Sequence, residues 1–255
     1  MIEALKPPRD KTANKSVDRA DKERVYLLHR RPFSETSIIG YFFTRSYGVV
    51  HVLARGAKRK RGSYSLLQPT MELLMSWSGR SDLKTMRSVE CNCRHNIYSG
   101  KGLTILFYLN ELLYKLLKPF DPHPDLYDKF HDFMLAESHE SFEGNLRKFE
   151  LELFAAVGYA VSIDSDYKSL EPLVSDGNYV YDPINGFTIS EADDPVNSFS
   201  GADLLKIKQG DYADPQIRYA AKSLSRQIIH HLLDSRRLSS RGLVIRSIHP
   251  DANVL

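Results

Sequence analysis

The chain has 255 residues, of which 42% are hydrophobic and 26% are charged. These proportions are ordinary for a globular protein in water, and the length allows one large domain or two small ones. No apolar run approaches the roughly 20 residues of a membrane-spanning helix, and the charged N-terminus lacks the apolar stretch of a signal peptide. The sequence therefore argues against a membrane or exported protein, and we expect a cytoplasmic one.

Charge is distributed unevenly along the chain. Residues 1–100 hold 19 Lys and Arg against 9 Asp and Glu, whereas the remaining residues hold 16 against 23. The first part thus carries a balance of +10 and the rest −7, although the net charge is only +3. A basic N-terminal part suggests a polyanionic partner, and nucleic acid is the commonest one.

Residues 1–23 are polar, mixed in charge and poor in large apolar side chains, which predicts a flexible extension. From Arg24 onward, short segments rich in β-branched and aromatic residues are bounded by Gly, Pro, Ser or charge. These segments predict five strands, over residues 24–33, 37–45, 48–57, 70–79 and 83–91. We therefore predict that residues 24–100 form a small barrel of the OB-fold type. An SH3-like barrel has a similar strand count, so the count alone leaves that alternative open.

The hydrophobic period changes to that of a helix at Gly102. The pattern predicts helices over residues 102–119, 123–138, 142–159, 201–210 and 214–235. Between them, residues 178–190 read as a β-hairpin with Asn185-Gly186 at or near its turn. We therefore assign residues 101–255 to a helical domain with a small β-hairpin insertion, and the whole chain to the α+β class.

The loop after the third predicted strand concentrates positive charge. It carries Arg55, Lys58, Arg59, Lys60 and Arg61. Because like charges repel, such a cluster costs folding energy unless an anion offsets it. Further basic residues lie near other strand ends, namely Arg30, Arg31, Arg45, Arg80 and Lys84, and aromatic residues lie among them at Phe33, Tyr47, Tyr64 and Trp77.

An OB-fold binds single strands with basic loops on the phosphates and exposed rings stacked on bases. We therefore predict that all ten basic residues, together with Tyr64, contact DNA. For Trp77, inside an apolar run, we favour core packing, whereas base stacking and core packing are equally open for Tyr64. A second basic cluster near the C-terminus either extends the DNA surface or meets an acidic peptide; it comprises Arg236, Arg237, Arg241 and Arg246.

Several motifs together resemble the RecO family of bacterial recombination mediators. In the first domain the shared pattern is Ser34-Glu35-Thr36-Ser37, Phe43-Thr44-Arg45, Ala54-Arg55-Gly56-Ala57 and, after the basic loop, Leu67-Gln68-Pro69. Further similar segments are "YLNELLYKLLKPFDPHPDLYDKF", "FELELFAAVGYAV", "YVYDPINGF" and "LDSRRLSSRGL". The resemblance spans about residues 24–245.

The resemblance implies a non-enzymatic DNA repair and recombination protein with an OB-fold joined to a helical domain. Such a protein binds single- and double-stranded DNA and anneals complementary strands. It recognises the C-terminal tail of single-stranded-DNA-binding protein (SSB). With RecR it helps to load RecA onto SSB-coated DNA in gap repair, which places it at the nucleoid. No cofactor is implied, and no Walker-type glycine loop or dinucleotide fingerprint is present.

One departure concerns zinc. Several members of the family carry a four-cysteine zinc site after the third long helix, but residues 158–200 contain no cysteine. We expect no metal there, and we expect the hairpin around residues 182–186 to take its place. Cys91, Cys93 and His95 share one face of a strand, yet we expect no functional metal site from them.

The alternatives to a DNA mediator are an RNA-binding OB-fold module and a nuclease. The residue set Asp121, His123 and Asp125 suggests a metal-dependent nuclease, but its prolines favour turn and helix-capping roles. His230 and His231 are adjacent on a helix and diverge too far to chelate one metal. No G-x-S-x-G nucleophile elbow is present. We therefore predict no catalytic residue.

Overall fold

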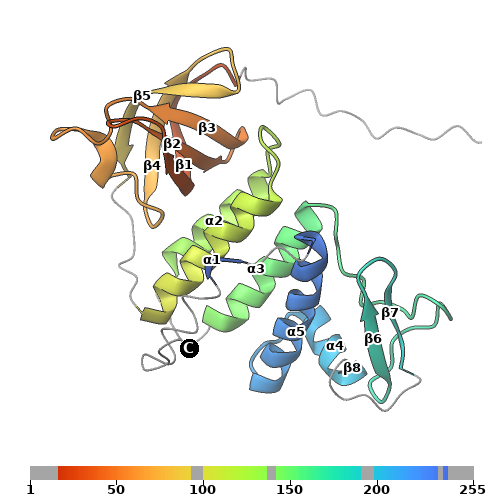
Figure 1. Cartoon of the computed structure of the whole chain (residues 1–255). Coiled ribbons are helices and arrows are strands. Elements are labelled where there is room, and N and C mark those ends of the chain that lie inside the picture. The colour runs from red at the N-terminus through yellow and green to blue at the C-terminus, as the bar shows by residue number, and fades with distance from the viewer. Residues whose placement is uncertain (1–16, 93–99, 137–141, 191–197, 235–237, 241–255) are drawn as a thin grey trace, which may run out of the picture. The chain divides into compact units, whose positions relative to one another are not determined.

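The computed structural model describes residues 17–92, 100–136, 142–190, 198–234 and 238–240 (Figure 1). These residues divide into two units. The first contains residues 17–92 together with Lys118–Pro124, and the second contains the other described residues.

The first unit is a five-stranded closed barrel with strand order β1-β2-β3-β5-β4. Its strands are β1 (Arg19–Pro32), β2 (Ile38–Thr44), β3 (Gly48–Ala54), β4 (Glu72–Ser78) and β5 (Leu83–Cys91). β1 pairs with both β2 and β4, and β3 and β5 run parallel while the other pairs are antiparallel. This is the topology of an OB-fold, so the predicted fold class is confirmed.

β1 begins earlier than the sequence indicated. Arg19 pairs with Ser78 and Ala20 with Trp77, so residues 19–23, which we assigned to the flexible extension, belong to the strand. The segment "RADKE" has almost no hydrophobic alternation, and only Ala20 in it is buried. This part of β1 is stabilised by pairing with β4 and not by apolar side chains, so the sequence gives little sign of it.

The interior of the barrel is filled by inward-facing side chains from all five strands. Val25, Phe42, Val50 and Met75 are each at most 2% exposed and belong to this core. Trp77 is 1% exposed and makes an edge-on ring contact with the buried Tyr47. Core packing of Trp77 is therefore confirmed, and Tyr47 is not available to stack on bases.

A short segment beyond the barrel strands also belongs to the first unit. Pro119 forms a β-bridge with Val49, and the Phe120 amide donates to the Val49 carbonyl at 3.1 Å. Gly48 has φ +68, and a Cβ there would lie 2.2 Å from the Asp121 carbonyl oxygen. Glycine therefore permits this close approach. The sequence had placed residues 118–124 in the helical domain, because nothing local marks their return to the barrel.

The second unit contains α1 (Gly100–Leu116), α2 (Pro124–Leu135), α3 (Phe142–Ala156), α4 (Gly201–Gln209) and α5 (Pro215–Leu232). The start of α5 follows a strong sequence signal, because Asp214 caps the Gln216 amide at 2.8 Å and Pro215 occupies the first turn. α5 packs against α3 and α4. None of the helices in the described ranges is both long enough and apolar enough to cross a bilayer.

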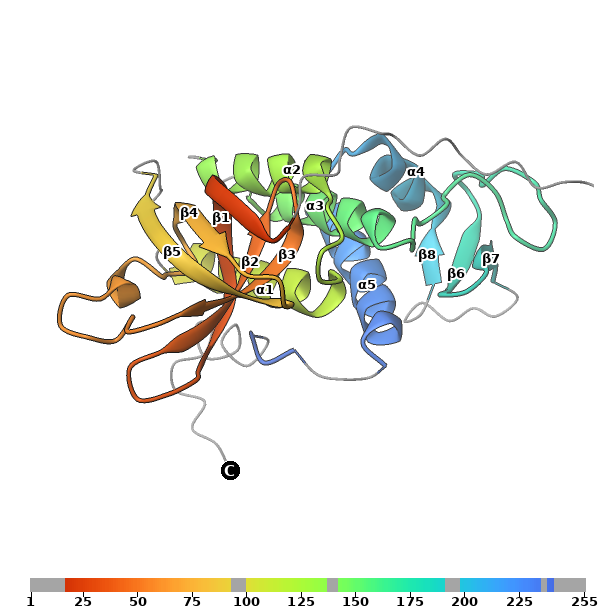
Figure 2. The same ribbon diagram turned by 90° about the horizontal axis from the view of Figure 1, so that it is seen from above.

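A three-stranded sheet lies next to α4 and α5 (Figure 2). Its order is β7-β6-β8, formed by β6 (Asn178–Asp182), β7 (Gly186–Ile189) and β8 (Ser198–Ser200). The predicted hairpin is therefore present, and its turn is held by Asp182, which accepts the amides of Ile184 and Asn185 at 2.8 Å each. β8 was not predicted, because three residues are too few to show a period.

Asp166 ties the segment before this sheet to β7. Its buried carboxylate accepts the Lys168 and Ile189 amides at 2.7 and 2.6 Å, and also bonds the Ser169 amide and the Thr188 hydroxyl. Burial acts to raise the pKa of Asp166, but these hydrogen bonds outweigh it and lower the pKa to about 2. The ionised Asp166 carboxylate therefore links residues 168–169 to β7, in a segment, residues 158–200, that contains no cysteine.

We expect Asp166→Ala to lower the free energy of unfolding by about 1–2 kcal/mol near neutral pH, because it removes the shared acceptor of three backbone amides and of the buried Thr188 hydroxyl. A carboxylate with a lowered folded pKa stabilises the fold above its unfolded pKa of about 4, and the contribution fades as the pH falls towards 2. Urea unfolding of both proteins at several pH values should therefore show a difference that narrows between pH 4 and 2. A difference that stays constant down to pH 2 would contradict the role of the ionised carboxylate.

Candidate nucleic-acid interface

The basic loop, residues 55–61, is folded rather than loose. Successive turns are closed by the Arg59 amide on the Gly56 carbonyl at 3.0 Å and by the Gly62 amide on the Arg59 carbonyl at 2.8 Å. At Gly62, a Cβ would lie 2.1 Å from the Ala57 carbonyl oxygen, so the backbone at Gly62 approaches that of Ala57 too closely for any residue with a side chain. Ala57 is buried in the barrel core, as is Leu67 beyond the loop. The loop is therefore anchored at both ends.

All five cations of the basic loop are exposed: Arg55, Lys58, Arg59, Lys60 and Arg61. None of them forms an ion pair with another residue in the described part of the chain. The fold thus holds five like charges close together in solvent, and no carboxylate of the described residues forms an ion pair with them. Such a site attracts anions, and most strongly a polyanion.

The β1–β2 turn lies against the basic loop. The Lys58 amide donates to the Thr36 carbonyl at 3.0 Å, and the Gly56 amide donates to the Ser37 hydroxyl at 3.3 Å. Phe33, in the same turn, has 56% of its surface exposed. A large exposed ring beside a cationic loop is the combination that base stacking uses.

Arg30 has a positioning role in this region. Its guanidinium donates to the Leu67 carbonyl at 2.6 Å and lies 4.1 Å from the centre of the Tyr64 ring. The Tyr64 ring is nevertheless 39% exposed, so the cation orients an accessible ring. Arg31 is exposed and donates from Nε to the Tyr41 hydroxyl at 3.0 Å.

The structure separates the predicted basic residues into two groups. Connections between antiparallel neighbours alternate between the ends of the barrel, so the 33–37 turn and the basic loop share one end. Since β3 and β5 are parallel, the turns before them lie together at the other end. Arg45 and Arg80, both exposed, belong to those turns. Arg45 and Arg80 therefore lie at the opposite end of the barrel from the basic loop.

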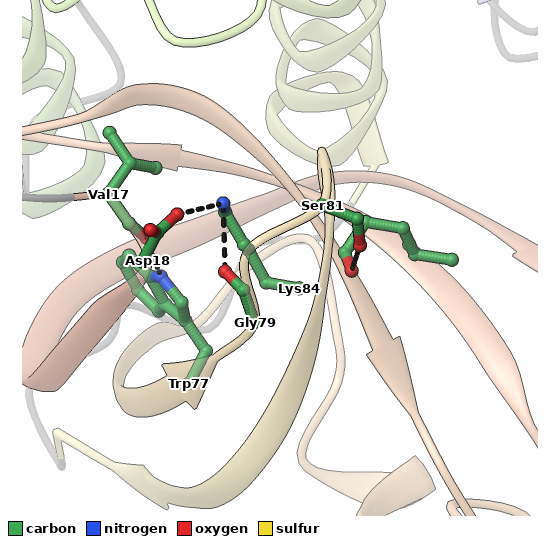
Figure 3. Close-up of polar contacts among 7 residues, drawn as sticks. Val17, Asp18, Trp77, Gly79, Ser81 and Lys84 are labelled. Carbon is green, nitrogen blue, oxygen red and sulfur yellow. Dashed lines mark hydrogen bonds and ion pairs between the residues drawn. The ribbon is translucent and has the colours of Figure 1, made fainter.

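Lys84 does not fit the predicted role in DNA binding. Its side chain is only 4% exposed, and its ammonium lies 3.1 Å from both the Asp18 carboxylate and the Gly79 carbonyl (Figure 3). The neighbouring Trp77 indole donates to the Val17 carbonyl at 2.9 Å. Lys84 thus fastens the start of β1 to the β4–β5 hairpin. The Lys84 side chain is buried because of the way β5 pairs with β3 and β4, and this pairing cannot be read from the neighbouring residues in the sequence.

We expect Lys84→Met to leave single-stranded DNA affinity within about twofold of wild type, because the Lys84 side chain is buried away from solvent and its partner Asp18 is half exposed, so water can solvate Asp18 when the lysine is lost. Lys60→Met, in contrast, should lower affinity about fivefold at 0.1 M salt, the effect of one lost phosphate contact. Fluorescence anisotropy with a labelled oligonucleotide measures both, and Trp77, the one tryptophan, reports whether the barrel is folded. Equal losses in the two variants would contradict this assignment.

The structure describes only some of the residues that make up the second basic patch and the candidate metal sites taken together. The second basic patch (Arg236, Arg237, Arg241, Arg246) lies outside the described residues, as do Cys93 and His95. His123 lies 3.6 Å from Asp121. Within the described ranges, no three His, Cys, Asp or Glu side chains are placed to hold a metal ion.

Sequence reasoning missed two exposed arginines, Arg19 and Arg87. Arg19 had been placed in the flexible extension, and Arg87 read as an ordinary residue of a strand. Both flank Ser78, since Arg19 pairs with it across β1 and β4 and Arg87 donates to its hydroxyl at 2.6 Å. Only the strand register brings them together, and the register is not visible in the sequence.

Comparison with known families covers nearly the whole described chain. The family described as "Recombination protein O N terminal" matches residues 20–92, and "Recombination protein O C terminal" matches residues 98–242. These two ranges correspond to the barrel with its flanks and to the helical part.

Curated relatives agree with these matches, and each is named "DNA repair protein RecO". The protein of Coxiella burnetii (strain RSA 493 / Nine Mile phase I) is 35% identical over 226 residues, covering 87% of this chain and 96% of that protein. That of Cellvibrio japonicus is 37% identical over 229 residues, covering 88% and 97%. That of Actinobacillus succinogenes is 36% identical over 228 residues, covering 89% and 96%. With both halves matched and relatives aligned over almost their full length, the chain belongs to the RecO family.

Proposed function

We propose that this protein is a DNA repair and recombination mediator that binds single- and double-stranded DNA through the barrel end bearing the basic loop. The observation that carries the proposal is the set of five exposed cations without a carboxylate partner among the described residues. The exposed rings of Phe33 and Tyr64 beside that loop supply stacking surfaces. Family membership supports the same function.

Strand annealing follows from the same surface. Two complementary strands repel each other through their phosphates, and a cationic surface that binds both screens this repulsion and raises their local concentration. This effect requires no bond to be made or broken by the protein. We therefore propose a mediator without catalytic residues and without a cofactor.

The proposed partners follow from the family. RecR, the SSB C-terminal tail and, indirectly, RecA complete a route by which RecA is loaded onto SSB-coated single strands in gap repair. An acidic tail of this kind is recognised by cations combined with an apolar pocket. Because DNA is the main ligand, we place the protein at the bacterial nucleoid.

Annealing of SSB-coated complementary strands tests the proposal most completely. The protein should accelerate annealing with intact SSB, and the acceleration should be largely lost with SSB that lacks its last residues. Annealing no faster than the spontaneous rate with either SSB would contradict the proposal. Competition between DNA and RNA oligonucleotides of matched sequence addresses the RNA alternative, and preferential binding of the RNA would favour that alternative.

A further inference from the structure

A hollow of about 410 Å³ lies on the barrel where the start of β1 and strands β4 and β5 run side by side. The side chains that matter for its chemistry are Arg19, Asp21, Ser76, Ser78, Arg87 and Ser88. All of them belong to the first unit. The hollow is distinct from the basic loop, because the C-terminal end of β4 and the turn that follows it lie at the opposite end of the barrel.

Two β-bulges create this hollow on either side of β4. The pairing of β1 with β4 shifts between Ala20 and Glu23, and Lys22 within that shift has φ +47. The pairing of β4 with β5 shifts between Ser76 and Trp77, which leaves Arg87 as the extra residue of β5. Bulges re-aim side chains and are enriched next to functional sites, and a non-glycine residue at positive φ stores strain.

The polar groups in the hollow come from three adjacent strands. Ser76 and Ser78 are two residues apart on β4 and so point to the same face, and Ser88 pairs with Ser76 from β5. Arg87 donates from Nε to the Ser78 hydroxyl at 2.6 Å. Serine hydroxyls and arginine side chains are the groups that bind phosphate oxygens in nucleic-acid complexes.

The charge of the hollow favours an anion. Arg19 and Arg87 are exposed, and neither pairs with a carboxylate of the described residues. The one acid, Asp21, accepts the Ser76 hydroxyl at 2.9 Å. Arg80, also exposed, follows two residues after Ser78. Arginine forks prefer oxyanions that offer two acceptors, as a phosphodiester does.

We propose that this hollow binds the phosphodiester backbone of a second nucleic-acid segment while the basic loop holds the first. The inference rests on the proposed function and adds to it a second, separate strand site on the same barrel. With phosphate contacts at both ends, one barrel holds two strands at once. Two strands held on one barrel would add close placement of the strands to the charge screening that the basic loop supplies.

The test compares two variants of the full chain, Arg19→Gln/Arg87→Gln and the control Lys206→Gln/Arg226→Gln. The control removes the same charge from exposed positions of the second unit. Each protein is titrated with oligo-dT by isothermal calorimetry, and the affinities for the first and the second oligonucleotide bound are fitted separately. Loss of two contacts should lower second-strand affinity about 25-fold at 0.1 M salt, while first-strand affinity stays within twofold. Arg19→Lys/Arg87→Lys should restore most of the second-strand binding.

Other results would overturn the site. If the Arg19→Gln/Arg87→Gln variant keeps both its second-strand and its first-strand affinity, the hollow is not a nucleic-acid site, but the proposed function stands. Equal losses for both strands indicate one continuous site rather than two. Binding of a poly-glutamate peptide that depends on Arg19 and Arg87, without any effect on the second strand, assigns the hollow to an acidic protein instead. A wild-type chain that binds no oligo-dT overturns the proposed function as well.

Discussion

Replacing Arg59, Lys60 and Arg61 by glutamine should lower the affinity for single-stranded DNA about 100-fold at 0.1 M salt. Each phosphate contact on a single strand contributes about 0.7 to the slope of log affinity against log salt. Three lost contacts therefore reduce that slope by about 2. The prediction is specific because it fixes the change in slope as well as the change in affinity, and a titration series at several salt concentrations gives both.

A control of equal charge separates this local effect from a change in overall charge. Lys168, Lys206 and Arg226 are exposed and belong to the second unit, and their replacement by glutamine lowers the net charge by the same three units. We expect that control to keep an affinity within about twofold of wild type, because none of the three residues belongs to the barrel that carries the proposed phosphate contacts. If the control loses as much affinity as the loop variant, attraction to the whole basic protein, and not the basic loop, explains the binding.

The second large effect is on stability, at the buried ion pair of α3. Glu150 is fully buried and lies 2.6 Å from the Arg147 guanidinium and 2.5 Å from the Tyr108 hydroxyl, which donates to it. Burial raises the pKa of Glu150, although the charge of Arg147 and the Tyr108 hydrogen bond oppose the rise. We expect Glu150→Ala to lower the free energy of unfolding by about 3–5 kcal/mol, because it leaves the Arg147 charge buried and unpaired.

The double variant Arg147→Met/Glu150→Leu provides the matched control. It removes both charges and fills the space with apolar side chains, which is often neutral or stabilising at buried ion pairs. Urea unfolding followed by the helical circular dichroism signal should therefore rank the double variant well above Glu150→Ala. A double variant as unstable as the single one would show that lost packing, and not the stranded charge, causes the instability.

The sequence predicts the two kinds of architecture well, because each has its own hydrophobic period. The five strands were predicted from short segments rich in β-branched and aromatic residues bounded by Gly, Pro, Ser or charge. The helices were predicted from their hydrophobic period and from signals such as the Asp214-Pro215 cap. The parallel pairing of β3 with β5, the early start of β1 and the return of residues 118–124 to the barrel were not found. These features arise from contacts between segments that are distant in the sequence, and local sequence patterns do not indicate such contacts.

The candidate site shows the same division. Charge density alone singled out the basic loop, and the structure keeps all five of its cations exposed. Lys84 looked equivalent in sequence, yet Asp18 and Gly79 take up its charge. Arg19 and Arg87 looked unrelated, yet both flank Ser78. Whether a basic residue of a strand faces a partner or solvent depends on register and bulges, which the sequence does not display.

The central claim is that the basic loop contacts nucleic-acid backbone, and lysine footprinting tests it most directly. The protein is acylated with and without a saturating oligo-dT, and labelling at Lys58 and Lys60 is compared with labelling at Lys168 and Lys206 by mass spectrometry. We predict that the oligonucleotide protects Lys58 and Lys60, that the two lysines of the second unit stay unchanged, and that high salt removes the protection. Unchanged labelling of Lys58 and Lys60 while the oligonucleotide is fully bound would contradict the claim.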